Sequence, residues 1–186
     1  MHEGVEADGT VKVRSSRRTH EGLLLKIDLD EVELPGGAVA KLESIRHPGA
    51  AAALPFLPDD RVLLVRQYRH AMGGWILEVP AGKLDDGEPP SECAVREVEE
   101  EVGHQVGALL ELGAIFTTPG FTDEVIWLYE AHDLTATSIA HEEDEVIEVI
   151  ELDFEEAVRM VRDGEIRDGK TVATILHAAL RRKETA

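Results

Sequence analysis

The chain has 186 residues, and 19 lysines and arginines face 38 aspartates and glutamates, so its formal net charge is −19 at pH 7. This charge disfavours binding to nucleic acid or to an anionic membrane surface. The one cysteine, Cys93, excludes an internal disulfide framework, and no apolar run approaches the ~18 residues of a membrane span. We expect a soluble, cytoplasmic protein with one catalytic domain and no nucleic-acid or membrane partner.

The N-terminal part predicts an antiparallel β extension. Residues 10–14 (TVKVR) alternate well enough for a short strand. Residues 23–34 and 38–47 alternate polar and apolar side chains on either side of Pro-Gly-Gly. Glycine tolerates the positive φ of a tight turn, so these two segments are expected to form a hairpin. We place the extension at residues 1–46 and the catalytic domain at residues 47–186.

Strands precede the first clear helix. Residues 51–57 and 62–69 flank Pro-Asp-Asp, which indicates a turn. A helix is expected to begin at Pro89 or Pro90 and to end at Gly103, because proline suits a first turn and glycine suits a C-terminal cap. Further strands are predicted at 109–116, 124–131 and 145–152, and further helices at 153–164 and 170–183. The fold class is therefore α+β with a mixed sheet.

The predicted helix concentrates negative charge in REVEEEVG, residues 96–103. A rotation of about 100° per residue places Glu97, Glu100 and Glu101 on one arc and Glu99 on the far side, near one edge of the apolar stripe formed by valines 95, 98 and 102. Glutamates three or four residues apart repel each other, and a bound cation would reverse this effect. Carboxylates without cysteine or histidine partners suit a hard ion such as Mg²⁺. A solvated acidic face is the alternative.

The spacing around this helix resembles the Nudix box. In GKLDDGEPPSECAVREVEEEVGH, residues 82–104, a glycine is followed after five residues by a glutamate and after seven more by REVEEEVG. Every specified position matches except the last, where His104 replaces an aliphatic residue, a departure that concerns local packing more than chemistry. The resemblance implies an α/β/α sandwich whose loop and helix bind divalent cations, Mg²⁺ or alternatively Mn²⁺.

The resemblance also implies roles for individual residues. The expected metal ligands are Glu97, Glu100, Glu101 and the carbonyl oxygen of Ala81, with Glu101 also counted as catalytic. Glu88 is an auxiliary acidic residue, and Arg96 orients the carboxylates. An exposed arginine in a weak surface pair is the alternative for Arg96. Gly82 and Gly103 serve the backbone bend and the helix end.

The flanking segments are similar to the ADP-ribose pyrophosphatase branch of the family. Pro119 follows Gly103 by 16 residues in TTPGFTDEVIWLYEA, and VRQYRHA precedes WILEVPAG. In the same loop, Gly120 and Glu124 are candidate substrate contacts, with plain loop geometry as the alternative.

Two arginines of VRQYRHA, Arg66 and Arg69, can clamp phosphate oxygens inside an acidic protein. They are three residues apart in a strand and point to opposite faces, so we expect one to face the site. Family position favours Arg69, and a surface or interface ion pair is the alternative for Arg66.

The acidic segment HEEDE, residues 141–145, offers a proton acceptor. By its place before the following strand, Glu143 is the expected general base and Glu145 the next candidate, as a base or a further metal ligand. A solvated acidic loop is the alternative.

The leading expectation is Mg²⁺-dependent hydrolysis of ADP-ribose, or of a related nucleoside diphosphate sugar, to a nucleoside monophosphate such as AMP and a sugar phosphate such as ribose 5-phosphate. The alternatives are another nucleotide sugar or dinucleotide polyphosphate as substrate, a nucleotide-binding module without catalysis, and an acidic metal-buffering or interaction protein. Related pyrophosphatases are commonly homodimers with exchanged N-terminal strands, so a homodimer is expected.

Overall fold

The computed structural model describes residues 11–139 and 147–185. The chain divides into two compact units. The first comprises Met1–Gly49 with Phe116–Val125, and the second comprises Ala50–Ile115 with Ile126–Ala186. The sequence interpretation assigned residues 116–125 to the catalytic domain, and its domain boundary stays a prediction. Within the described residues, no helix has both the length and the apolar character needed to cross a membrane.

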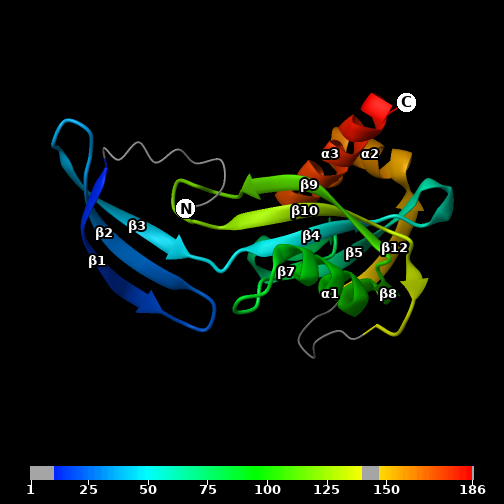
Figure 1. Ribbon diagram of the computed structural model, residues 1–186, viewed down its shortest axis with the longest axis horizontal. Helices are drawn as coiled ribbons and strands as arrows, with labels where there is room; N and C mark the ends of the chain where they lie inside the picture. Colours follow the sequence, from blue (N-terminus) through cyan, green and yellow to red (C-terminus); the bar gives the residue numbers. More distant parts are fainter. Residues whose placement is uncertain (1–10, 140–146, 186) are drawn as a thin grey trace. The chain divides into compact units, whose positions relative to one another are not determined.

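The first unit contains a three-stranded antiparallel sheet, in the order β1-β2-β3, formed by Lys12–Glu21, Lys26–Glu33 and Val39–Arg46 (Figure 1). The expected hairpin is confirmed, since Gly36 and Gly37 adopt positive φ angles of 90° and 88° between β2 and β3. The expected short strand at residues 10–14 is longer than its alternation indicated. It continues as β1 through polar residues because its backbone pairs with β2.

The second unit contains all three α-helices of the described chain and the remaining strands, except for one terminal residue each of β9 and β10, Phe116 and Val125. The four-stranded sheet has the order β7-β4-β10-β9, with β4 parallel to β10 and antiparallel to β7. An antiparallel sheet has the order β12-β5-β6, and β11 pairs with β8. The strands are β4 Ala50–Pro55, β5 Arg61–Arg69, β6 Gly74–Glu78, β7 Ala81–Lys83, β8 His104–Gln105, β9 Ala108–Phe116, β10 Val125–His132, β11 Thr135–Ala136 and β12 Ile147–Asp153. The helices are α1 Pro90–Val102, α2 Phe154–Arg162 and α3 Gly169–Thr185.

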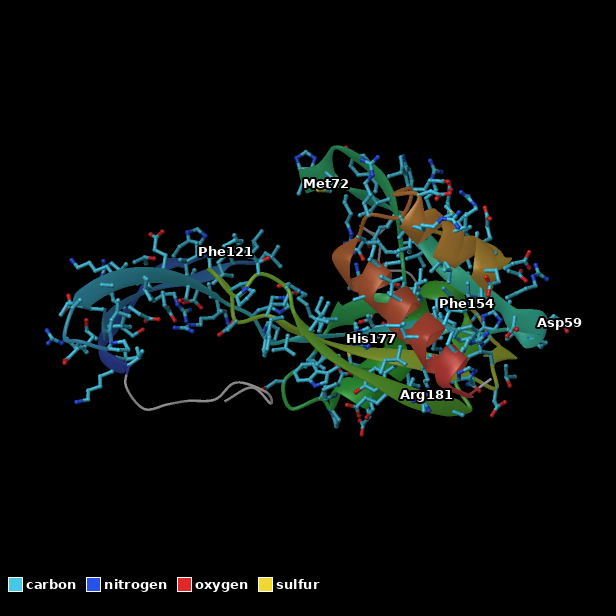
Figure 2. All side chains as sticks on the ribbon, turned by 90° about the horizontal axis from the view of Figure 1, so that it is seen from above. Asp59, Met72, Phe121, Phe154, His177 and Arg181 are labelled. Atoms are coloured by element: carbon cyan, nitrogen blue, oxygen red, sulfur yellow. The ribbon has the colours of Figure 1, made fainter. Side chains whose placement is uncertain are left out.

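Strand β4 lies between two hydrophobic cores. Successive residues of a strand point to opposite faces, so Ala52 packs with Ile175 of α3, whereas Ala53 packs with Val98 of α1. The helices α1 and α3 accordingly lie on opposite sides of the sheet (Figure 1). Phe154, at the start of α2, joins the α3 side (Figure 2). The mixed sheet with helices on both faces confirms the expected α+β sandwich.

The turn signal at residues 58–60 separates strands that enter different sheets. A short 3₁₀ helix, Pro58–Asp60, connects β4 to β5, and one isolated bridge joins Phe56 to Val62. The Pro-Asp-Asp signal predicts that the chain reverses direction, but it does not predict which strands pair with β4 and with β5. The strands β6 and β7 are too short to show a period in the sequence.

Candidate active site

Helix α1 begins and ends where its sequence predicts. Pro90 is its first residue, and Gly103 adopts a left-handed conformation with φ of 67° directly after Val102. The N–H of Gly103 donates to the carbonyl oxygen of Glu99 at 3.1 Å, which closes the last turn. The helix packs against β4 through Ala94 and Val98, which are fully buried. Val95 was expected to face the core but is only half-buried, at the side of a surface hollow.

Arg96 binds three carboxylates at once. Its Nε and Nη2 atoms donate to the two oxygens of Glu88 at 2.9 and 3.1 Å. Its Nη1 atom donates to Glu97 Oε1 at 2.6 Å and to Glu100 Oε2 at 3.1 Å. A planar guanidinium with several fixed donors holds its acceptors in defined directions. Arg96 therefore fixes the relative orientation of these carboxylates.

The same contacts shift the ionisation of Glu88. The hydrogen bonds from Arg96, followed by one from the N–H of Asp85, lower the pKa of Glu88 to about 2. The pKa of Arg96 is raised in turn, chiefly by its hydrogen bond to Glu88. Both groups thus keep their charge at and well below neutral pH.

Two of the three predicted ligand carboxylates are buried. Glu97 is 8% exposed and Glu101 is 4% exposed, although both are acidic. The N–H of Ala81 donates to Glu101 Oε2 at 3.2 Å, which ties the helix to β7. A Cβ atom on Gly82 would lie 1.8 Å from Glu97 Oε1, so any larger residue here would require this carboxylate to move. Buried carboxylates are costly unless a cation or hydrogen-bond donors compensate them.

The donor set suits a hard divalent cation. The candidate ligands are the carboxylates of Glu97, Glu100 and Glu101 and the carbonyl oxygen of Ala81, all of them oxygen donors. Within residues 11–139 and 147–185, however, no three acidic, histidine or cysteine side chains already converge around a metal position. Arg96 pairs with Glu97 and Glu100 here. Binding a cation would therefore require these carboxylates to exchange part of their contact with Arg96 for the ion.

A second charged group adjoins this site from β5 and β6. Arg69 donates from Nη2 to Glu78 Oε2 at 2.6 Å and from Nε to the same oxygen at 3.1 Å. Burial acts to lower the pKa of Arg69, but the hydrogen bond and charge of Glu78 outweigh burial, and the charge of Glu101 adds to them. The pKa of Arg69 is therefore raised. Arg69 therefore interacts electrostatically with Glu101, one of the candidate metal ligands.

Comparison with known protein families identifies the segment that contains β7, the following loop and α1. The NUDIX domain matches residues 45–175. The chain belongs to the Nudix family. The Nudix box at residues 82–104 lies entirely inside the matched region and coincides with β7, the following loop and α1.

Several known proteins resemble the chain over most of its length. A methanol dehydrogenase activator of Bacillus methanolicus is 38% identical over 91% of this chain and 92% of its own. An ADP-ribose pyrophosphatase of Bacillus subtilis is 36% identical over 91% of this chain and 93% of its own. A GDP-mannose pyrophosphatase of Yersinia enterocolitica is 37% identical over 84% of this chain and 87% of its own.

A solved structure shares the fold. The crystal structure of an ADP compounds hydrolase superposes with a TM-score of 0.84, covering 95% of this chain and 96% of that chain. Its sequence is 20% identical. The similarity at this level of identity concerns the Nudix fold with its N-terminal sheet.

The two candidate arginines of β5 have different surroundings. Arg66 donates to Glu148 Oε2 at 2.8 Å across the β5–β12 pair, and its guanidinium lies 4.7 Å from the ring centroid of Trp75. These contacts form the surface ion pair that the sequence left open for Arg66. Arg69 instead binds the buried carboxylate of Glu78. A substrate-binding role for either residue stays a prediction.

The predicted residues of the PGFTDE loop belong to the first unit. Glu124 accepts a hydrogen bond from Thr117 Oγ1 at 2.7 Å and lies 3.6 Å from His47 Nε2. A Cβ atom on Gly120 would meet nothing within 4 Å, so this position has open space beside it. Pro119 and Gly120 line a pocket together with residues of β2 and β3. Their substrate contacts stay predictions, and Glu143 and Glu145 lie outside the described residues.

Sequence reasoning missed Glu78 and Lys170. The Nζ atom of Lys170 lies 3.0 Å from Glu78 Oε1, and the side chain of Glu78 is 4% exposed. The position of Glu78, three residues before Ala81, was the available signal, but a single acidic residue in a strand has no periodic pattern. Lys170 lies 92 positions after Glu78 and gave no sign of a connection with it.

Proposed function

We propose that the protein is a Mg²⁺-dependent Nudix pyrophosphohydrolase that cleaves ADP-ribose to AMP and ribose 5-phosphate. The observation that carries the proposal is the Nudix box, in which Glu97 and Glu101 are buried. Glu97 lies against Gly82 and pairs with Arg96, and Glu101 accepts from the N–H of Ala81. The similarity to proteins named ADP-ribose pyrophosphatase supports the substrate class. Mn²⁺ is the alternative ion.

Phosphate recognition is assigned to Arg69. Its Nε and Nη2 atoms are occupied by Glu78, and no described residue accepts a hydrogen bond from its Nη1 atom. A guanidinium edge with free donors suits a phosphate oxygen. The opposite charge of Arg69 also offsets the repulsion that the acidic site would exert on a pyrophosphate.

Hydrolysis adds water across the pyrophosphate. The water oxygen forms a bond to one phosphorus atom, the bridging P–O bond breaks, and the leaving phosphate group takes the electron pair. A divalent cation held by Glu97, Glu100, Glu101 and the Ala81 carbonyl would neutralise phosphoryl charge and lower the pKa of the attacking water. We assign Glu143 as the general base that accepts a proton from this water, with Glu145 as the next candidate base or a further metal ligand. Removal of a general base typically lowers the rate by about 10²- to 10⁴-fold.

A second substrate is favoured by one comparison. The relatives include proteins named GDP-mannose pyrophosphatase, at 37% identity over 84% of this chain. GDP-mannose has the same pyrophosphate between a nucleoside and a sugar, so the same box and the same Arg69 would serve it. A nucleotide-binding module without catalysis is less consistent with a full set of carboxylates.

A substrate panel tests the proposal. Purified protein with Mg²⁺ is incubated with ADP-ribose, GDP-mannose and diadenosine polyphosphates, and the products are separated by anion-exchange chromatography. We expect AMP and ribose 5-phosphate as the main products. A preference for GDP-mannose would establish the second substrate, and the absence of any hydrolysis would contradict catalysis.

Two matched variants test the ligand assignment in the same assay. Glu101→Gln should lower kcat at least about 100-fold, because loss of a metal ligand costs more than loss of an outer-shell partner. Glu99→Gln should leave kcat within about twofold, since the carboxylate of Glu99 accepts from Gln105 Nε2 at 3.3 Å and makes no ion pair with Arg96 among the described residues. Near-full turnover of Glu101→Gln at saturating Mg²⁺ would contradict the assignment.

We also propose a homodimer that uses the first unit. Residues Leu23, Leu24 and Leu25 in the β1–β2 connection are 111%, 66% and 41% exposed, and every residue of β1 is exposed. Exposed apolar side chains gathered in one segment are typical of an interface. Sedimentation equilibrium at micromolar concentration should give twice the chain mass of 20.4 kDa, and a monomer mass would contradict the proposal.

A further inference from the structure

Four charged side chains of alternating sign connect the start of α3 to Arg69. Lys170 Nζ lies 3.0 Å from Asp168 Oδ2 and 3.0 Å from Glu78 Oε1. Glu78 in turn accepts from Arg69 at 2.6 Å. The side chains of Asp168, Lys170 and Glu78 are 17%, 12% and 4% exposed, so water screens these contacts weakly. Through these contacts, the position of Lys170 at the start of α3 constrains the position of Glu78 and, through it, that of Arg69.

The first turn of α3 is itself fixed to the corner between β6 and β7. Asp168 Oδ2 accepts from the N–H and the hydroxyl of Thr171 at 3.0 and 2.6 Å. Thr171, which is fully buried, accepts from the N–H of Val79 at 2.9 Å. Val79 lies two residues before Ala81, the candidate carbonyl ligand. Lys170 is thus held on a turn that cannot shift independently of the site.

The two oxygens of Glu78 differ in their shortest contacts. Oε2 accepts the short hydrogen bond from Arg69 Nη2 at 2.6 Å, whereas Oε1 lies 3.0 Å from Lys170 Nζ and accepts a longer hydrogen bond from Arg69 Nε at 3.3 Å. Without Lys170, the buried carboxylate would have Arg69 as its main counter-charge and could rotate to bind more of the guanidinium. With Lys170 present, the carboxylate is held in one orientation, and Arg69 keeps its Nη1 edge outside this contact.

We infer that Lys170 is a positioning residue for substrate recognition, which acts through Glu78 to present the Nη1 edge of Arg69 to a substrate phosphate oxygen. The inference rests on the proposed function, because that function assigns the phosphate to Arg69. Asp168 and Thr171 complete the device by fixing the turn that carries Lys170. Lys170 itself contacts no reacting atom in this arrangement.

A double-mutant cycle tests the inference on the full chain. We expect Lys170→Met to raise KM for ADP-ribose about 10-fold with a smaller change in kcat, because the interaction lost is made in the ground state and the transition state alike. Arg69→Met should raise KM further. The double variant should be no worse than Arg69→Met alone, since Lys170 acts through Arg69. Lys170→Arg should recover most of the wild-type KM.

A binding measurement gives a readout independent of turnover. Isothermal titration calorimetry with α,β-methylene ADP-ribose should show about a 10-fold weaker Kd for Lys170→Met. Lys183→Met, which removes an exposed lysine from the same helix, should leave both Kd and KM unchanged. If Lys170→Met does not fold, Lys170→Gln replaces it, because the amide retains a donor for Glu78 while the charge is lost.

The outcomes separate the two claims. Equal Kd and KM for wild type and Lys170→Met, or additive effects in the double variant, would overturn the role of Lys170. A lower kcat and a smaller folded fraction for Lys170→Met, with KM unchanged, would also overturn this role, because that result would indicate that Lys170 only supports the fold. A wild type that neither binds the analogue nor hydrolyses ADP-ribose would contradict the proposed function instead.

Discussion

Gly82→Ala is the sharpest perturbation of the Nudix box. The added Cβ atom would lie 1.8 Å from Glu97 Oε1 and 2.2 Å from its Cδ, whereas ordinary contacts begin near 3.4 Å. The carboxylate must therefore retreat by about 1.6 Å in a close-packed surrounding. This movement would break the 2.6 Å hydrogen bond from Arg96 Nη1. The methyl group thus displaces a candidate metal ligand while it leaves the charge of the site unchanged.

The expected effects follow from this displacement. A misplacement of about 1 Å can lower a catalytic rate about 10²-fold, so we expect kcat to fall at least about 100-fold. Overpacking typically costs about 1–3 kcal/mol, so the free energy of unfolding should decrease by that amount while the protein stays folded. A large loss of rate with a modest loss of stability is the signature we expect.

The assay follows phosphate release from AMP and ribose 5-phosphate by a coupled phosphatase at saturating Mg²⁺, with urea unfolding measured in parallel. Gly74→Ala is the matched control, because a Cβ atom on Gly74 meets nothing within 4 Å, and we expect its kcat to stay within about twofold. A folded Gly82→Ala protein with wild-type kcat would refute the reasoning, since Glu97 could then not act from the position that the structure gives it.

Two further predictions concern ionisation. The pKa of Glu88 is lowered from 4.5 to about 2, so its contacts with Arg96 contribute stability that is complete above about pH 4.5 and is lost as the pH falls toward 2. The free energy of unfolding of Glu88→Gln should therefore fall less than that of the wild type between pH 5 and pH 3, and equal decreases would count against this ion pair. Burial raises the pKa of the Cys93 thiol to about 12, so iodoacetamide at pH 8 should modify the native protein at least about 100-fold more slowly than the urea-unfolded protein, and similar rates would show that Cys93 is accessible.

The Nudix helix illustrates what local sequence determines. Proline at its start and glycine at its end act on their own backbone, and the apolar period of about 3.6 residues identifies the buried face. The glutamates of the box lie within one loop and one helix, so their spacing along the chain sets how close they lie in the folded protein. The box could therefore be located from residues 82–104 alone.

The burial of side chains in the same helix was harder to predict from the sequence. The helical arc placed Glu97 and Glu101 together but did not indicate that both are almost completely buried. A helical wheel gives the direction of a side chain and not what packs against it. Here Gly82 and the N–H of Ala81 lie against these carboxylates, and both come from β7.

The sequence by itself determined the family, the order of the longer strands and of the helices, and the candidate metal ligands, because each depends on spacing within a short segment. Tertiary structure alone decided that Arg66 pairs with Glu148, 82 residues later, and that Glu78 pairs with Lys170. Such partners meet only after the sheets and α3 have packed, and their separation along the chain has no period. Contacts of this kind depend on which strands pair and where a helix crosses them, and charge pattern alone leaves both undetermined.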